Sequence, residues 1–189
     1  MRNVVLASNT DSLAAAARKA EAAPGYRVLN LGSFLEGETR QAATVLAGVV
    51  RSIRRHGVPF APPVCLLSGG ETTVTLGPEH GQGGRNQEFV LATMLKLGVG
   101  ELADAVVLSG GTDGEDGPTD AAGAIGDAAT LAEAARRGLD PAAFLDRHDA
   151  YPFFAATGDL LRTGLTGTNV MDVRLTLIPT PRADEGENV

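Results

Sequence analysis

The chain has 189 residues, of which 43% are apolar and 21% are charged, and its formal net charge is −7 at pH 7. This length and composition predict one ordinary globular domain with a full hydrophobic core. The negative charge and the presence of only two lysines, Lys19 and Lys96, argue against a nucleic-acid partner and against an anionic membrane surface. Because the sequence has no apolar run of about 18 residues and no cleavable leader, we expect a cytoplasmic protein.

Strand and helix patterns alternate along the chain. Residues 3–8 predict a short strand, after which Thr10, Asp11 or Ser12 is expected to cap an alanine-rich helix that ends at residues 24–25. Later strands are expected at residues 26–31, 63–68, 72–76, 105–108 and 172–178, and helices at residues 38–56, 86–97 and 127–137 and from residue 140.

This alternation predicts an α/β fold, a three-layer α/β/α domain with a mixed, mostly parallel sheet. We expect a single domain over residues 1–178 and a flexible tail over residues 179–189. The single cysteine, Cys65, lies in an apolar stretch and is expected to be a buried, inert thiol. The three histidines, His56, His80 and His148, are scattered and lack the spacing of a zinc site.

Residues 106–123, VVLSGGTDGEDGPTDAAG, lead an apolar strand into a glycine-rich loop with three carboxylates. These are Asp113, Asp116 and Asp120. Hard oxygens on such a loop suit Mg²⁺, which prefers a few carboxylates together with water and substrate phosphates. The same residue types are ordinary turn formers, so an acidic surface loop is an equal alternative from the local chemistry.

A second predicted strand also ends in Ser-Gly-Gly, at residues 69–70, and Glu71 follows it. Residues 81–88, GQGGRNQE, then open a helix and offer backbone N–H groups together with Arg85, a planar cation suited to phosphate or carboxylate. Ligands of open α/β sheets bind beyond the carboxyl ends of the strands. We therefore expect the two Ser-Gly-Gly corners to line one cleft.

Two nucleotide-binding motifs are absent. Gly81 and Gly83 are followed by Asn86 where the third glycine of the dinucleotide fingerprint would stand, and neither lysine follows a glycine as a P-loop requires. The sequence therefore supports neither a Rossmann nicotinamide site nor a P-loop nucleotide site.

Four longer segments occur in order, SGGETTVTL, GQGGRNQEF, GGTDGEDGPTDAAGAI and TGLTGTNVMDV. Together they resemble the C-terminal MOFRL region of the glycerate 2-kinases, a family often labelled hydroxypyruvate reductase. The upstream segments NVVLASNTDSLAAAA and LEGETRQAA extend the resemblance over residues 3–178. Leu165 and Met171 stand where the family pattern has proline and asparagine, which loosens a turn and removes an amide from that loop.

The resemblance implies a transferase that moves the γ-phosphoryl group of ATP to the 2-hydroxyl group of D-glycerate with Mg²⁺. The family's complete enzyme has two α/β domains with the active site between them, and this chain resembles only the second. The first domain would supply further glycine-rich loops and a lysine. We therefore expect the isolated chain to be catalytically incomplete and to need an N-terminal kinase domain, which a separate polypeptide could provide.

Phosphoryl transfer needs a cation, a metal carboxylate and backbone donors more than covalent chemistry. Arg85 is the candidate for contacting the glycerate carboxylate or the transferring phosphoryl group, with a surface ion pair as the alternative. Asp113 and Asp116 are candidates for Mg²⁺ binding or hydroxyl activation, with turn capping as the alternative. Further candidates for substrate or phosphate binding, each with a local structural alternative, are Gly69, Gly70, Glu71, Gly83, Gly84, Asn86, Thr112, Thr119, Asp120, Thr168 and Asn169.

Three functions remain open at this point. The first is the substrate- and metal-binding half of an ATP-dependent glycerate 2-kinase. The second is a non-catalytic module that binds a small anion or regulates another protein. The third is a hydroxypyruvate reductase, as the family label suggests, although the absent dinucleotide fingerprint weighs against it.

Overall fold

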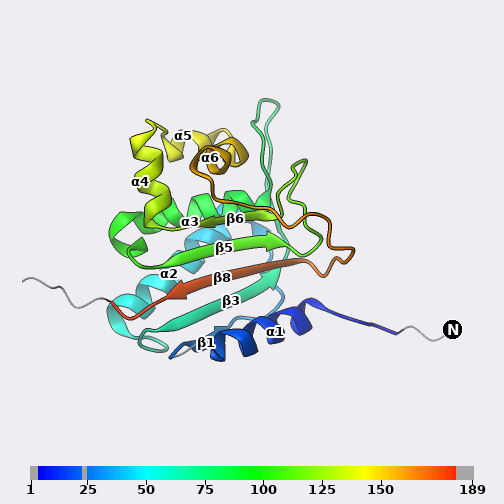
Figure 1. Cartoon of the computed structure of the whole chain (residues 1–189), viewed down its shortest axis with the longest axis vertical. Helices are drawn as coiled ribbons and strands as arrows, with labels where there is room; N and C mark the ends of the chain where they lie inside the picture. Colours follow the sequence, from blue (N-terminus) through cyan, green and yellow to red (C-terminus); the bar gives the residue numbers. More distant parts are fainter. Residues whose placement is uncertain (1–3, 23–24, 182–189) are drawn as a thin grey trace, which may run out of the picture.

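The computed structural model of the chain describes residues 4–22 and 25–181 (Figure 1). Its strands are β1 (Arg27–Asn30), β2 (Gly37–Glu38), β3 (Val64–Gly70), β4 (Thr72–Thr73), β5 (Val106–Gly111), β6 (Gly123–Gly126), β7 (Leu160–Leu161) and β8 (Asp172–Ile178). Its helices are α1 (Asn9–Glu21), α2 (Thr39–His56), α3 (Arg85–Leu102), α4 (Ala128–Arg136), α5 (Pro141–Asp146) and α6 (Ala150–Thr157).

Six strands form the main sheet in the order β1-β3-β8-β5-β6-β7, and β2 and β4 form a separate parallel pair. The predicted α/β class and mixed sheet are confirmed, but the expectation of a mostly parallel sheet is wrong. Only β1 and β3 are parallel neighbours within the main sheet, and the other neighbouring pairs are antiparallel. The physical reason is that β8, the last strand, enters between β3 and β5 and runs opposite to both, while β6 lies antiparallel beside β5 and β7 lies antiparallel beside β6.

Helices cover both faces of the sheet, as predicted for three layers (Figure 1). Side chains alternate across β3, so Val64 and Leu66 face the large core under α2 and α3, whereas Cys65 and Leu67 face α1. The three short helices α4, α5 and α6 form an outer group against α3. The core is therefore largest on the side of the sheet that carries α3.

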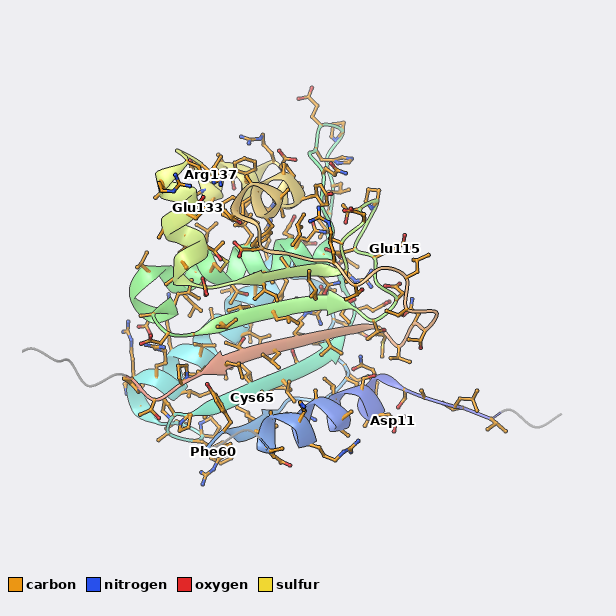
Figure 2. All side chains as sticks on the ribbon, viewed as in Figure 1. Asp11, Phe60, Cys65, Glu115, Glu133 and Arg137 are labelled. Carbon is orange, nitrogen blue, oxygen red and sulfur yellow. The ribbon has the colours of Figure 1, made fainter. Side chains whose placement is uncertain are left out.

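The expectation of a buried cysteine is confirmed. Cys65 lies in β3 on the side of α1, and burial raises the pKa of its thiol to about 11 (Figure 2). A thiol with such a pKa carries almost no thiolate near neutral pH, which makes it a poor nucleophile.

Three local expectations near the N-terminus and β3 are wrong. Residues 4–8 form no strand, residue 3 of that prediction lies outside the described part, and Ser8 rather than Thr10, Asp11 or Ser12 caps α1. Ser8 and Asp11 form a reciprocal capping box, in which the Ser8 side chain accepts from the Asp11 N–H and the Asp11 side chain accepts from the Ser8 N–H. Likewise, β3 continues through Gly70 instead of ending at residue 68, and only Thr72–Thr73 of the strand expected at residues 72–76 form a strand, β4, which pairs with β2.

The remaining differences concern short elements and the end of the chain. The predicted strand at 105–108 extends as β5 to Gly111, while β6, β7 and α6 were not predicted. Residues 179–181 have no regular structure, and residues 182–189 of the predicted tail lie outside the described residues.

The two Ser-Gly-Gly corners meet at one edge of the sheet, as the sequence predicted. β3 and β5 run in the same direction because both are antiparallel to β8. Gly70 at the end of β3 and Gly111 at the end of β5 both pair with Asp172 at the start of β8. The fold thus places one buried carboxylate between the two glycine-rich corners.

A substitution at Gly70 tests how closely the loop that contains Leu35 approaches this edge of the sheet. Gly70 has φ of +114°, and an added Cβ would lie 2.5 Å from the carbonyl oxygen of Leu35. We expect Gly70→Ala to lower the free energy of unfolding by about 2 kcal/mol or more, because both the backbone conformation and the contact are unfavourable. Urea denaturation measures this change.

The matched control is Gly48→Ala. Gly48 is an exposed residue within α2 with no atom near its added Cβ, so alanine is expected to raise the free energy of unfolding by about 0.5–1 kcal/mol. A Gly70→Ala protein as stable as the wild type would contradict the close approach of the loop to β3.

Candidate active site at the carboxyl edge of the sheet

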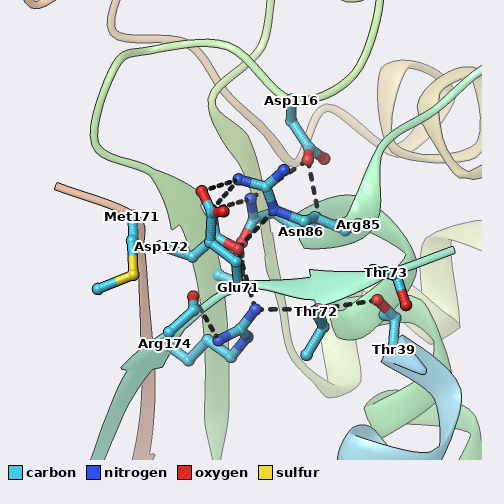
Figure 3. A network of polar contacts seen from close by, with 12 residues as sticks. Thr39, Glu71, Thr72, Thr73, Arg85, Asn86, Asp116, Met171, Asp172 and Arg174 are labelled. Atoms are coloured by element: carbon cyan, nitrogen blue, oxygen red, sulfur yellow. Dashed lines mark hydrogen bonds and ion pairs between the residues drawn. The ribbon is translucent and has the colours of Figure 1, made fainter. Parts of the chain in front are cut away.

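Asp172 is the centre of a buried polar network (Figure 3). Its side chain is fully buried and accepts hydrogen bonds from Arg85 Nε at 2.7 Å and Arg85 Nη2 at 2.9 Å. Arg174 Nη2 and Asn86 Nδ2 each donate to it at 3.0 Å. Asp172 therefore meets two guanidinium groups and an amide, and buried carboxylates need such compensation for lost hydration.

Arg174 is the buried cation of this network. Its side chain is 1% exposed, and it donates to the carbonyl oxygen of Gly70 and, at 3.0 Å, to the hydroxyl oxygen of Thr72. Burial lowers the pKa of the guanidinium, although Asp172 acts in the opposite direction. Thr39, the first residue of α2, donates to the same Thr72 hydroxyl. Through these bonds the small β2–β4 sheet and α2 are tied to β8.

Asp116 caps α3 from the acidic loop. Gly84 is the N-cap residue and has no side chain to offer, so Asp116 accepts from the backbone N–H groups of Asn86 at 3.0 Å and Gln87 at 2.8 Å. A Cβ at Gly84 would lie 2.3 Å from the Asp116 carboxyl carbon, which explains the glycine. The predicted backbone donors of this helix start are thus already bonded to a protein carboxylate.

Burial also changes the acidity of Asp116. Desolvation raises the pKa of this carboxyl group to about 6, against the opposing effect of the hydrogen bonds from Asn86 and Gln87. Thr119, another predicted site residue, lies behind it and donates from its hydroxyl group to the Asp116 carbonyl oxygen. Asn86 is buried as well and bridges Asp116 to Asp172.

Arg85 is the partly exposed cation of the site. Its side chain is 33% exposed, and Nη2 also donates to Glu71 Oε1 at 3.0 Å. The hydrogen bond to Asp172 is the largest cause of its raised pKa, so the guanidinium stays charged. Within the described residues, the hydrogen bonds of Arg85 use Nε and Nη2 only. The two N–H bonds of Nη1 are therefore available to a ligand.

A cavity of about 360 Å³ opens beside Arg85. It runs between the start of α3, the segment after β4, the Gly117–Pro118 turn and His148. Gly83 and Gly84 line it, together with the apolar side chains of Val74 and Leu76. A volume in this range suits a small organic ligand.

The outer loops contribute a second, more exposed group. Asp113 accepts from Asn169 Nδ2 at 3.0 Å and from the backbone N–H of Glu115. Thr112 donates from its hydroxyl group to the carbonyl oxygen of Met171, which joins the acidic loop to the loop before β8. Thr168, by contrast, bonds within its own loop to Thr166.

Asp120 lies in a separate surface cluster. It accepts from the Tyr151 hydroxyl group at 2.6 Å and from Arg162 Nε at 3.2 Å. Gly69 lies at the end of β3, where its N–H donates to the carbonyl oxygen of Gly32. The fold thus gathers Glu71, Arg85 and Asn86 around Asp172 and puts Asp120 elsewhere.

Sequence reasoning missed Asn9 and Arg174, and for Asp172 it left substrate binding and a structural loop role equally open. Asn9 is buried at the start of α1 and donates to the carbonyl oxygens of Val170 at 2.7 Å and Asp172 at 2.9 Å. Arg174 could have been noticed, because it is a charged residue on the alternating strand β8 and shares a face with Ile178. For Asn9 the sequence gives no such signal.

The donor chemistry of Asp113 fits a divalent cation, whereas that of Asp116 fits poorly. Asp116 is 2% exposed and accepts three hydrogen bonds from the start of α3, two of them from backbone N–H groups and one from the Asn86 side chain. Asp113 is less buried and has lone pairs left after two hydrogen bonds. No group of three or more His, Cys, Asp and Glu side chains within residues 4–22 and 25–181 could hold a metal ion alone.

Comparison with known proteins decides the family. Residues 64–172, more than half of the chain, match the MOFRL family. The chain belongs to the MOFRL family. The glycerate 2-kinase of Pyrococcus horikoshii is 39% identical over 96% of this chain and 40% of its own length. A protein of Agrobacterium vitis named "Putative hydroxypyruvate reductase" is 46% identical over 92% of this chain and 45% of its own length.

Solved structures agree with this family assignment. The crystal structure of a glycerate kinase from Thermotoga maritima has a TM-score of 0.82 and 35% identity over 90% of this MOFRL chain and 40% of the kinase chain. The chain therefore spans less than half the length of these relatives. No helix within the described residues is long and apolar enough to cross a membrane.

The raised pKa of Asp116 predicts a pH-dependent stability. The folded protein binds this proton more tightly than the unfolded chain, so the stabilising contribution is present below about pH 4 and is lost as pH rises through about 6. Relative to Asp116→Asn, the wild type should lose up to about 3 kcal/mol of unfolding free energy across this window. Chemical denaturation of both proteins between pH 4 and 7 measures the difference.

Glu133→Gln provides a control of opposite sign. The two neighbouring arginines lower the pKa of Glu133 to about 2, so its contribution is present above the unfolded pKa and is lost as pH falls. A constant difference between wild type and Asp116→Asn from pH 4 to 7 would show that Asp116 has an ordinary pKa.

Proposed function

We propose that this chain is the C-terminal substrate- and metal-binding part of an ATP-dependent glycerate 2-kinase. In this proposal, the chain acts in the cytoplasm together with an N-terminal part. That part would correspond to the portion of the relatives that this chain does not cover. The reaction is transfer of the γ-phosphoryl group of ATP to the 2-hydroxyl group of D-glycerate. The observation that carries the proposal is Arg85, which Asp172 and Glu71 hold beside a cavity and whose Nη1 makes no hydrogen bond to the residues that the structure describes.

Arg85 would bind an anionic group of one substrate. Its position is fixed by two parallel hydrogen bonds to Asp172, so the guanidinium is already oriented when a ligand arrives. A carboxylate of glycerate or an oxygen of the transferring phosphoryl group could accept from Nη1. Neutralising such charge is the main requirement of phosphoryl transfer.

Mg²⁺ remains part of the proposal through Asp113. The ion would offset phosphate charge and orient the triphosphate, as it does in other phosphoryl-transfer sites. Asn169 donates to one oxygen of the Asp113 carboxylate and thereby holds it at the rim of the site. Asp116 would affect the site indirectly, because the hydrogen bonds that it accepts from the start of α3 fix the position of that helix.

An exposed apolar surface supports the need for a complementary part. The extended N-terminal segment runs away from the sheet and exposes Val4, Val5 and Leu6 by 70%, 81% and 94% (Figure 1). Phe34, on the loop after β1, is 88% exposed, and a hydrogen bond joins this loop to α1. Such surfaces mark interaction sites, and we propose that the N-terminal kinase part covers this one.

The two other functions predict different behaviour. An anion-binding or regulatory module would bind glycerate or phosphate without turnover, even when the N-terminal part is present. A hydroxypyruvate reductase would oxidise a nicotinamide cofactor, for which the sequence offers no dinucleotide fingerprint. Both alternatives are separated from the kinase by one set of assays.

The isolated chain is expected to transfer no phosphate from ATP to D-glycerate at an enzymatic rate. Adding the N-terminal part of the Pyrococcus horikoshii kinase, as a separate chain or as a fusion, should give turnover of about 1 s⁻¹ or more. A coupled ADP-release assay measures the rate, and parallel samples with NADH and hydroxypyruvate should show no reduction. Turnover of about 1 s⁻¹ by the chain alone would overturn the proposal of a complementary part.

The apolar surface supplies the control for this assay. The double variant Leu6→Asp, Phe34→Asp should fold normally because both side chains are exposed, yet it should need a higher concentration of the separate N-terminal chain for the same activity. An unchanged concentration dependence would show that another surface makes the contact.

Arg85 is expected to be irreplaceable by lysine in the completed enzyme. An ammonium group cannot make the paired hydrogen bonds to Asp172 and still direct donors toward a ligand. Arg85→Lys and Arg85→Ala should each lower kcat/KM by roughly 10² or more. Glu71→Gln, which keeps an acceptor for Nη2, should lower it much less.

Melting temperatures separate catalysis from folding. We expect both Arg85 variants to remain folded, since Arg174 and Asn86 still compensate Asp172. Unchanged kcat/KM in Arg85→Ala would identify Arg85 as a surface residue, and a large loss of stability would identify it as structural.

A further inference from the structure

A second polar cluster lies one helical turn beyond Arg85. Glu88 is on the same face of α3, and its side chain is only 3% exposed. Its Oε1 accepts from Arg40 Nε at 2.7 Å, and its Oε2 lies 2.8 Å from His148 Nδ1. Glu88 and His148 both line the cavity that Arg85 enters. The side chains that line the cavity therefore include a cation, Arg85, and an imidazole, His148, that is bonded to a carboxylate.

The position of His148 is fixed by its neighbours. It follows α5 with φ of +53°, a left-handed conformation in which glycine is more usual, and its N–H donates to the carbonyl oxygen of Leu145. On either side of it, the carbonyl oxygen of Arg147 accepts from Gly81 N and the Asp149 carboxylate accepts from Gln82 N. The segment that forms the cavity wall is thus bonded to the turn that carries His148.

The hydrogen bond to Glu88 selects one tautomer of the ring. An ionised carboxylate can only accept, so Nδ1 of His148 carries the proton that it donates to Oε2. Arg40 Nη2 donates to the carbonyl oxygen of Leu145, and its distances of 2.9 Å to Nδ1 and 3.5 Å to Nε2 place it over the face of the ring, out of line with the lone pair of either nitrogen. Nε2 then keeps its lone pair. A neutral imidazole oriented in this way is suited to accept a proton from a hydroxyl group.

We propose that His148 is a catalytic residue, the base that accepts the proton of the acceptor hydroxyl group, with Glu88 and Arg40 as positioning residues. This proposal rests on the proposed kinase function. The hydroxyl proton moves to Nε2, the hydroxyl oxygen forms a bond to the γ-phosphorus, and the bond from that phosphorus to ADP breaks. ADP leaves with the electron pair, and the imidazolium later releases its proton to solvent.

The same arrangement would engage both functional groups of the proposed hydroxy-acid acceptor. Arg85 provides donors for a carboxylate or phosphoryl oxygen, and His148, which lines the same cavity, provides an acceptor for a hydroxyl group. A carboxylic acid without a hydroxyl group would leave Nε2 without a partner.

The charged and titratable groups around the ring come from three elements. Arg40 on α2 and Glu88 on α3 contact it directly, and Arg85 on α3 and His80 on the segment after β4 line the same cavity. Protonation of His148 would place a second cation beside Arg40, with Glu88 as the compensating anion.

The first test is the tautomer of His148 in the whole chain, read from ¹⁵N ring signals by NMR. We expect the proton on Nδ1 in the neutral ring, and we expect Glu88→Gln to abolish this preference. A ring with its proton on Nε2 would overturn the proposal, whether or not the chain has any kinase activity.

The second test uses the chain fused to the N-terminal part of the Pyrococcus horikoshii kinase. His148→Gln should lower kcat by about 10² or more with little change in KM for ATP, and it should remove the acidic limb of the pH profile. Glu88→Gln should lower kcat less than His148→Gln does. His56→Gln, at the exposed end of α2, is the control and should leave the rate unchanged.

The outcomes separate the two proposals. An active fusion whose kcat is unchanged within about threefold by His148→Gln overturns the role of His148 and leaves the kinase proposal standing. An inactive wild-type fusion overturns the kinase proposal, and the base role falls with it. A His148→Gln fusion with a lowered melting temperature but an unchanged acidic limb would show that the residue only supports the fold.

Discussion

The charge compensation of Asp172 is the interaction on which the edge of the sheet depends. A fully buried carboxylate is unfavourable unless donors replace its lost hydration, and leaving such a charge without any partner typically costs about 3–5 kcal/mol. Arg174 satisfies this need from within β8, Asn86 from α3, and Arg85 from the helix start. The carboxylate thus fixes the relative positions of the central strand and the helix that carries the candidate site.

The antiparallel entry of β8 makes this arrangement possible. Had the sheet been fully parallel, the start of the last strand would lie at the opposite edge from the ends of β3 and β5. Instead Asp172 pairs with Gly70 on one side and with Gly111 on the other. Glycine at these corners lets neighbouring loops approach closely, as the short distance from a Gly70 Cβ to Leu35 shows. The strand direction and the glycines therefore act together.

Sequence reasoning recovered what local pattern determines. The long helices, the buried strand around Cys65 and the convergence of the two Ser-Gly-Gly corners follow from periodicity and glycine placement. The insertion of β8 could not be predicted, because no local pattern states which strands become neighbours. The role of Asp116 as a helix cap could not be predicted for the same reason, because Asp116 is separated from Asn86 by 30 positions in the sequence.

Glu88 and His148 illustrate the same limit at the site. Periodicity predicts only that α3 is buried on most sides, and a lone histidine after a short helix carries no spacing signal. The fold brings them within 2.8 Å from positions 60 residues apart.

Because Arg174 already compensates Asp172 from the buried side, Arg85 can serve both the network and a ligand. Because Asp172 is shared between a buried and a partly exposed arginine, a stable edge of the sheet can also present a cation to a ligand. The partly exposed arginine is oriented by the network and lines the cavity that it shares with His148.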